Sequence, residues 1–181
     1  MASFQERVIG ALKLQPATYE EVEKDTTATS QAAIVVGAGA ISAALAGFGY
    51  ATVTVTLVTV VLSLISWVVG AFVLLIVGTR LIPGRNTQAD LGQMLRTVGF
   101  ARAPGLFAVL GVIPLLGFLI SLALMVWGLV ALVIAVRQAL DYDDTIKAVI
   151  VCVITWVIMM VVMALAALLG VGATIGSASM F

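Results

Sequence analysis

Long uncharged stretches divided by short polar segments form the pattern of this chain. No charged residue lies between Gln31 and Thr79, and 34 uncharged residues separate Arg102 from Arg137. A third uncharged stretch runs from Ala148 to the last residue. Because about 20 apolar residues in a helix cross the hydrocarbon core of a bilayer, these stretches predict membrane-spanning helices.

The first two uncharged stretches are each too long for one ordinary span and are expected to fold back once. The break in the first is expected within GFGYAT, residues 47–52, and the break in the second at Pro114 and Gly117. A re-entrant hairpin that does not cross the bilayer is the alternative for the second stretch. The predicted spans cover about residues 32–48, 53–77, 104–118, 120–136 and 148–169.

The N-terminal polar segment predicts a short amphipathic helix. Phe4, Val8 and Leu12 recur at four-residue spacing, and Arg7 lies on the opposite, polar side. This pattern is typical of a helix lying on the bilayer surface, and Pro16 is expected to end it. The first 30 residues hold three basic and five acidic side chains and no long apolar run, so we do not expect a cleavable signal peptide.

Two further short helices are expected in the polar segments. Thr18 and Glu21 have the spacing of a capping box, which predicts a second helical piece before the first span. Thr87 and Asp90 are spaced as a helix start, and the apolar residues after them recur on one helix face, which predicts an interfacial helix over about residues 87–100.

Together these elements predict an all-α, polytopic integral membrane protein with five transmembrane helices plus short interfacial amphipathic helices. Residues 1–30 would form a cytoplasmic N-terminal segment and residues 31–181 the membrane domain. The composition agrees, since 62% of the residues are apolar and 10% are charged. With five spans, all nine Lys and Arg residues fall on one side, which places the N-terminus in the cytoplasm and the C-terminus outside.

The charge and residue inventory excludes several classes of function. A formal net charge of zero argues against nucleic-acid binding, which needs an excess of Lys and Arg. Histidine is absent and Cys152 is the single cysteine, so Ser-His or Cys-His catalysis and an intrachain disulfide are excluded. No nucleotide-binding or nucleophile motif is present, so we expect a protein that is not an enzyme and that has no cofactor.

A face of small and hydroxyl-bearing residues follows the second predicted span. Such a face lines a polar pathway or, alternatively, packs closely against another helix, with hydroxyls bonded to backbone carbonyls. A similar small-residue spacing on the first span favours packing. The face on the second span comprises Thr52, Thr56, Thr59, Ser63, Ser66 and Gly70, and that on the first comprises Gly39, Ala43 and Gly47.

Charged residues are expected only near the ends of the predicted spans. Coupled ion transport generally needs a charged or titratable group at membrane depth, so this pattern argues against it and leaves a passive pore or lipid movement open. Arg102 is expected at the mouth of the third span, where it would reach lipid phosphates. Asp141, Asp143 and Asp144 favour a solvated turn over a calcium or magnesium site.

The cytoplasmic face is the predicted binding surface for membrane lipids or a partner protein. Basic side chains there would contact lipid headgroups or acidic partners, and acidic ones would offer the opposite sign. The candidates are Arg96, Arg102, Arg137, Lys147, Glu20, Glu21 and Glu23.

Three stretches of the chain resemble the Yip (Ypt-interacting protein) family of five-span membrane proteins. They are LKLQPATYEEVEKD, GFARAP and WGLVALVIAVRQALDYDDTIKAV. The matching residues are Pro16, Tyr19 and Glu23; Gly99, Phe100 and Pro104; and Trp127, Arg137, Leu140, Thr145, Lys147 and Ala148. The short N-terminal segment is most similar to prokaryotic members.

The resemblance implies a non-enzymatic role in membrane organisation, in a bacterial inner membrane. Eukaryotic relatives associate with small GTPases, but this chain lacks a DLYGP-type segment before the first span, and its nearest approach is ADLGQ at residues 89–93. We therefore expect a scaffold or adaptor that forms homo-oligomers and binds lipid headgroups or a protein partner. The alternative is a passive transporter, channel or lipid-moving protein with a Thr/Ser-lined route along the second span.

Overall fold

The computed structural model describes residues 2–47, 52–85, 87–113 and 115–168, and every regular element within these ranges is a helix. The N-terminal helices are α1 (Phe4–Leu12) and α2 (Pro16–Lys24). The remaining elements are α3 (Ala28–Ala46), α4 (Val53–Ile76), the π-helical turn η1 (Val77–Leu81), α5 (Leu91–Ala101), the 3-10 helix η2 (Ala103–Val112), α6 (Gly117–Ala139) and α7 (Thr145–Leu168).

Five segments are long and apolar enough to cross a membrane, which confirms the predicted fold class. They run over Ala28–Ala46, Val53–Leu81, Leu91–Val112, Gly117–Ala139 and Thr145–Val162. The expected breaks at residues 48–51 and at Pro114 lie outside the described residues.

The third candidate span begins earlier than the pattern predicts. The expected interfacial helix corresponds to α5, which runs directly into η2 to form one candidate span. Asp90 caps α5 by accepting a hydrogen bond from the Gln93 backbone, and the Gln93 side chain accepts one from the Asp90 backbone. Because α5 packs against α2, α3, α4 and α6, its apolar face is covered by other helices.

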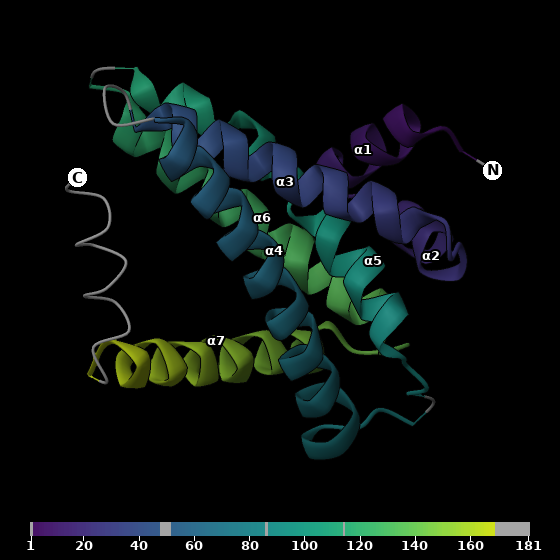
Figure 1. The fold of residues 1–181 in the computed structure, drawn as a ribbon. Coiled ribbons are helices and arrows are strands. Elements are labelled where there is room, and N and C mark those ends of the chain that lie inside the picture. The colour runs from purple at the N-terminus through teal and green to yellow at the C-terminus, as the bar shows by residue number, and fades with distance from the viewer. Residues whose placement is uncertain (1, 48–51, 86, 114, 169–181) are drawn as a thin grey trace.

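The helices α1 and α2 form a hairpin that packs on the membrane bundle. The ring of Phe4 meets that of Phe100 on α5 edge-on, with centroids 6.5 Å apart. The second helix begins at Pro16, which is well placed in the first turn because it has no N–H to leave unpaired. The predicted capping box is therefore wrong, since Thr18 lies buried within α2. Figure 1 shows this hairpin beside α5 and the start of α3.

The first and third candidate spans approach closely along small residues. A Cβ added to Gly39 of α3 would lie 3.5 Å from the backbone of Gly105 in η2. The hydroxyl of Ser42 donates to the carbonyl of Leu106 at 2.8 Å and accepts from the backbone N–H of Val109 at 2.9 Å. These two bonds satisfy backbone groups of η2, a 3-10 helix of unusual length.

The helix α7 is only partly covered by the other described helices. It contacts α6, and near its beginning it also meets α4 and η1 (Figure 1). Its outer residues include Trp156, which is 64% exposed, and Met160. Such exposure of apolar side chains is expected for helices that face lipid.

Candidate functional site

A cavity of about 750 Å³ lies between the spanning helices. Its volume falls in the range of about 300–1,000 Å³ that is usual for small-molecule sites. The wall is mostly apolar and includes several small residues, among them Gly39, Gly70, Gly105 and Gly128. Side chains of α3, α4, α5, η2, α6 and α7 all contribute, so the cavity is central to the bundle.

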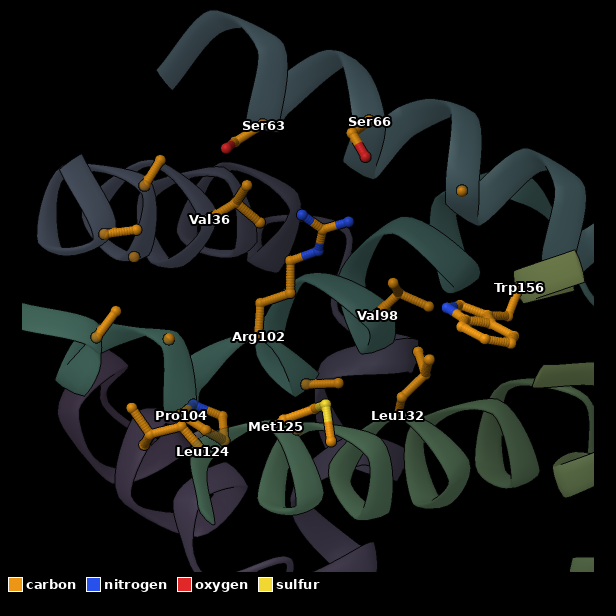
Figure 2. A pocket seen from close by; sticks show the side chains of 18 of the residues that line it. Val36, Ser63, Ser66, Val98, Arg102, Pro104, Leu124, Met125, Leu132 and Trp156 are labelled. Atoms are coloured by element: carbon orange, nitrogen blue, oxygen red, sulfur yellow. The ribbon is translucent and has the colours of Figure 1, made fainter. Parts of the chain in front are cut away.

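Arg102 is the one charged residue in the cavity wall. It lies at the junction of α5 and η2, where its backbone N–H donates to Gly99 and its carbonyl accepts from Gly105. Figure 2 shows its side chain reaching toward the helix that carries Ser63 and Ser66. Among the described residues, no carboxylate forms an ion pair with its guanidinium and no group forms a hydrogen bond with it.

This position differs from the expected one at a helix mouth. Because α5 and η2 form one candidate span over Leu91–Val112, Arg102 falls near its middle and Arg96 also lies within it. Within this candidate span Arg102 thus lies far from either end, whereas the sequence pattern placed it at a helix mouth. A cation within a span is costly in hydrocarbon and often marks a functional site.

Hydroxyl and thiol groups accompany Arg102 in the cavity wall. Thr155 of α7 is only 7% exposed, and its hydroxyl has no hydrogen-bond partner within the described part of the chain. Ser121 of α6 and Cys152 of α7 line the same cavity. Polar groups from facing helices thus converge on a space that is otherwise apolar.

The predicted face on α4 divides into two parts. The hydroxyls of Thr56 and Thr59 donate to the carbonyls four residues earlier, at 3.0 Å and 2.8 Å, and Thr52 caps the helix. Ser63, Ser66 and Gly70 instead line the cavity. The hydroxyls bonded to backbone carbonyls thus lie in the first part of α4, and the residues that line the cavity lie further along the helix.

The small residues of α3 also lie in two different environments. Gly39 and Ala43 both line the cavity, and Gly39 in addition approaches η2 closely. Gly47 lies at the C-terminal end of α3, where its backbone N–H donates to Ala44.

Arg96 joins α5 to α2 through backbone carbonyls. Its guanidinium donates to the carbonyls of Val22 and Glu23, and its side chain is only 6% exposed. The carboxylate of Glu23 accepts instead from the side chain of Gln93 at 3.1 Å. Arg96 and Glu23, which were both predicted to bind lipids or partners, therefore contact each other in the protein interior.

Burial makes the carboxyl group of Glu23 a weaker acid than usual. Loss of water raises its pKa to about 7, and the negative charge of Asp141 acts in the same direction. Glu20 also raises this pKa, whereas the positive charges of Lys24 and Arg96 lower it. This carboxyl therefore titrates near neutral pH.

The remaining predicted acids occupy different environments. Glu20 forms an exposed ion pair with Lys24 at 2.8 Å. Glu21 accepts from the guanidinium of Arg7 at 3.1 Å and from the backbone N–H of Ala2 at 2.9 Å. Arg7 was expected on a polar outer face but is only 2% exposed. The structure therefore places Glu21 in a contact between α1 and α2.

Hydrogen bonds hold the loop before α7. Arg137 donates to the carbonyls of Tyr142 and Asp143, each at 3.2 Å, and Lys147 lies half-buried. The Asp144 carboxylate accepts from the Ile146 backbone at the start of α7. Within the described residues, no group of three His, Cys, Asp or Glu residues could hold a metal ion.

Several residues that position this arrangement were not singled out for these roles by the sequence patterns. Trp67 donates to the carbonyl of Leu95, and Trp127 donates to the carbonyl of Leu12, each at 3.0 Å. The Tyr142 hydroxyl binds the carbonyls of Gly78 and Ile82. In the sequence, such contacts are indicated only by a Trp or Tyr that lies inside an apolar run or beside a turn, because its N–H or O–H needs a hydrogen-bond partner when buried.

Comparisons with known proteins place the chain in one family. A search of curated proteins and a search of solved structures each found no match. The model of the Yip1 domain matches residues 9–166, a range that covers all five candidate spans. The chain thus belongs to the Yip1 domain family of membrane proteins.

Proposed function

We propose that this chain is a non-enzymatic membrane-organising protein, a scaffold or adaptor that engages other molecules through a rigid polar end. We use the term polar end for α1, α2 and the described parts of the two loops at residues 82–90 and 140–144. Membership of the Yip1 family supports a role within the membrane. The Lys and Arg residues that lie outside the candidate spans or at their ends all fall on one side, which supports a cytoplasmic polar end.

The attachment of the N-terminal hairpin to the bundle is the observation that carries this proposal. Trp127 of α6 holds the C-terminal end of α1 through the Leu12 carbonyl. Arg96 of α5 holds the C-terminal end of α2 through two further carbonyls. A flexible tether would not need these bonds, whereas a surface of fixed geometry suits recognition with little loss of conformational entropy.

The two loops are joined to the same end of the molecule. Thr87 donates to the carbonyl of Leu140 at 2.8 Å and accepts from the backbone N–H of Gly84 at 2.9 Å. Exposed charges of both signs surround these contacts, including Glu20, Lys24 and Asp141. The polar end therefore offers a charged and pre-organised surface to a protein partner, a second copy or lipid headgroups.

Site-specific photocrosslinking tests the proposal. A photoreactive residue at Lys24 lies on the polar end, and one at Leu115, which is 98% exposed, lies at the opposite end of α6. We expect a discrete crosslinked species from position 24, identified by mass spectrometry as a second copy or as a stoichiometric partner, and none from position 115. Equal labelling at both positions, with no discrete species, would contradict an adaptor role.

A passive route through the bundle is the second candidate, and the position of Ser63 and Ser66 on the cavity wall favours it. Flux of a solute or labelled lipid through proteoliposomes would be lost in Ser63→Leu and kept in Thr56→Leu, because the Thr56 hydroxyl is bonded to its own helix. Flux that neither variant changes would argue against this route.

A further inference from the structure

We propose that the cavity around Arg102 binds an anionic phospholipid from the surrounding bilayer, with the lipid phosphate against the guanidinium. No residue of α1, α2 or the two polar loops is among those that line this cavity, so the site does not depend on the proposed adaptor role.

The guanidinium of Arg102 lacks a counter-charge within the described protein. None of the residues lining the cavity is Asp or Glu, and each acid that forms an ion pair does so with Arg7 or Lys24. An unpaired cation inside a membrane bundle is costly, so an anion that enters the cavity would be strongly favoured. A phosphate matches the planar set of donors that arginine presents.

A second and independent observation is the unpartnered hydroxyl of Thr155. This side chain is more than nine-tenths buried, lines the cavity and has no hydrogen-bond partner in the described chain. Ser63 and Ser66 line the wall toward which Arg102 reaches (Figure 2). Hydroxyls of this kind can donate to phosphate or ester oxygens of a lipid.

The rest of the wall suits an acyl chain rather than a free ion. Val36, Leu74, Leu124, Met125 and Leu132 provide apolar surface around the polar groups. A free inorganic anion would leave most of this surface facing empty space or water. A lipid places its phosphate at the arginine and covers the apolar wall with its chain, which contributes about 0.8 kcal/mol per buried CH₂.

Lipid selectivity of the intact protein is the primary test. The purified full-length chain, stripped of bound lipid in mild detergent, is titrated with short-chain phosphatidylglycerol and short-chain phosphatidylcholine, and bound lipid is counted by native mass spectrometry. Both lipids carry a phosphate, but the choline cation of phosphatidylcholine offsets its charge, so we expect phosphatidylglycerol to bind Arg102 about tenfold more tightly. Equal binding of the two lipids by the wild type would overturn the proposal, and this readout needs no variant.

Variants at the site then locate the binding. We expect Arg102→Gln to lose the preference for phosphatidylglycerol and Arg102→Lys to keep part of it, because lysine retains the charge without the fork of donors. Arg85→Gln is the matched control, since Arg85 is exposed on the polar loop. An unchanged preference in Arg102→Gln, or an equal loss in Arg85→Gln, would overturn the assignment.

A third measurement separates a lipid from a free anion. Inorganic phosphate at millimolar concentration is added as a competitor of phosphatidylglycerol. We expect little displacement, because phosphate cannot replace the contacts of the acyl chain. Complete displacement would show a site for soluble anions and would overturn the lipid assignment.

Discussion

The guanidinium of Arg7 lies 2.6 Å from the carboxylate of Asp25, and both side chains are buried between the N-terminal hairpin and α3. Gln31 at the start of α3 accepts from the same guanidinium at 3.0 Å. Thr27 donates to Asp25 through its hydroxyl and its backbone N–H, and these bonds together with Arg7 lower the pKa of Asp25 to about 2. One residue of α1 therefore links α2, the following turn and the first span.

Removing this arginine is predicted to loosen the hairpin. In Arg7→Ala the carboxylate of Asp25 stays buried without its cation, which typically reduces the free energy of unfolding by about 3–5 kcal/mol. Thermal unfolding in nanodiscs and proteolysis of the hairpin measure the effect. Lys24→Ala is the control, because it breaks the exposed pair with Glu20 and should change stability by less than about 1 kcal/mol. Equal effects of the two variants would contradict the structural role of Arg7.

Stability is predicted to fall as the pH rises through the titration of Glu23. The folded protein keeps this proton up to about pH 7, whereas the unfolded chain releases it near the ordinary value of 4.5. The folded state thus binds more protons between these values, and its stability decreases as the pH increases across this window. Melting temperatures at pH 5.5 and pH 7.5 measure the change.

Two variants assign this pH dependence. Glu23→Gln keeps an acceptor for Gln93 but cannot titrate, so its melting temperature should vary less with pH than that of the wild type. Glu20→Gln should keep most of the wild-type dependence, because the pKa of Glu20 is lowered by Lys24 to below the window and Glu20 is only a lesser cause of the raised pKa of Glu23. A wild-type dependence in Glu23→Gln would assign the effect to another group.

Gly99 is predicted to be needed for the close packing of three helices. An added Cβ would lie 2.6 Å from the Cβ of Ala32 on α3 and 3.2 Å from the ring of Trp67 on α4. Gly99→Ala should therefore destabilise the bundle by about 1–3 kcal/mol, as overpacked sites do. Gly37→Ala is the control, since nothing lies within 4 Å of its added Cβ. Similar melting temperatures for both variants would refute this packing.

Ser42 is predicted to stabilise η2 through its two backbone contacts. Ser42→Ala removes a donor for Leu106 and an acceptor for Val109, and unpaired buried groups cost about 1–3 kcal/mol. Thr59→Val offers a control, because its hydroxyl bonds only to the carbonyl of Val55 in its own helix. Hydrogen exchange of the η2 amides should increase in Ser42→Ala, and an unchanged pattern would speak against the bridge.

The fold class could be predicted because its signals are local. Uncharged stretches marked the spans, and the spacing of Phe4, Val8 and Leu12 marked α1, whose inner face packs on the core. The start of α5 could be predicted only approximately, because Thr87 and Asp90 have the spacing of a helix start whereas Asp90 itself is the capping residue. These features depend on neighbours within one or two helical turns, so the sequence contains them directly.

The candidate site could be predicted only in part, because it depends on contacts between distant segments. The position of Arg102 beside a long apolar run suggested a helix mouth, and only the packing of α5 among four helices shows that the span begins earlier. Arg7 looked solvated because its partner Asp25 is 18 residues away. Polar residues whose partners come from another helix are thus the ones that sequence periodicity misplaces.

The 3-10 geometry of η2 changes how far the chain reaches. A 3-10 helix rises about 2.0 Å per residue and an α-helix about 1.5 Å, so the ten residues of η2 extend about 20 Å instead of about 15 Å. Added to α5, this gives roughly 36 Å from 21 helical residues, more than the thickness of about 30 Å of a hydrocarbon core. The 3-10 half of this span thus adds about 5 Å to the reach of an α-helix with the same number of residues, and it leaves Arg102 at the joint between two helical pitches.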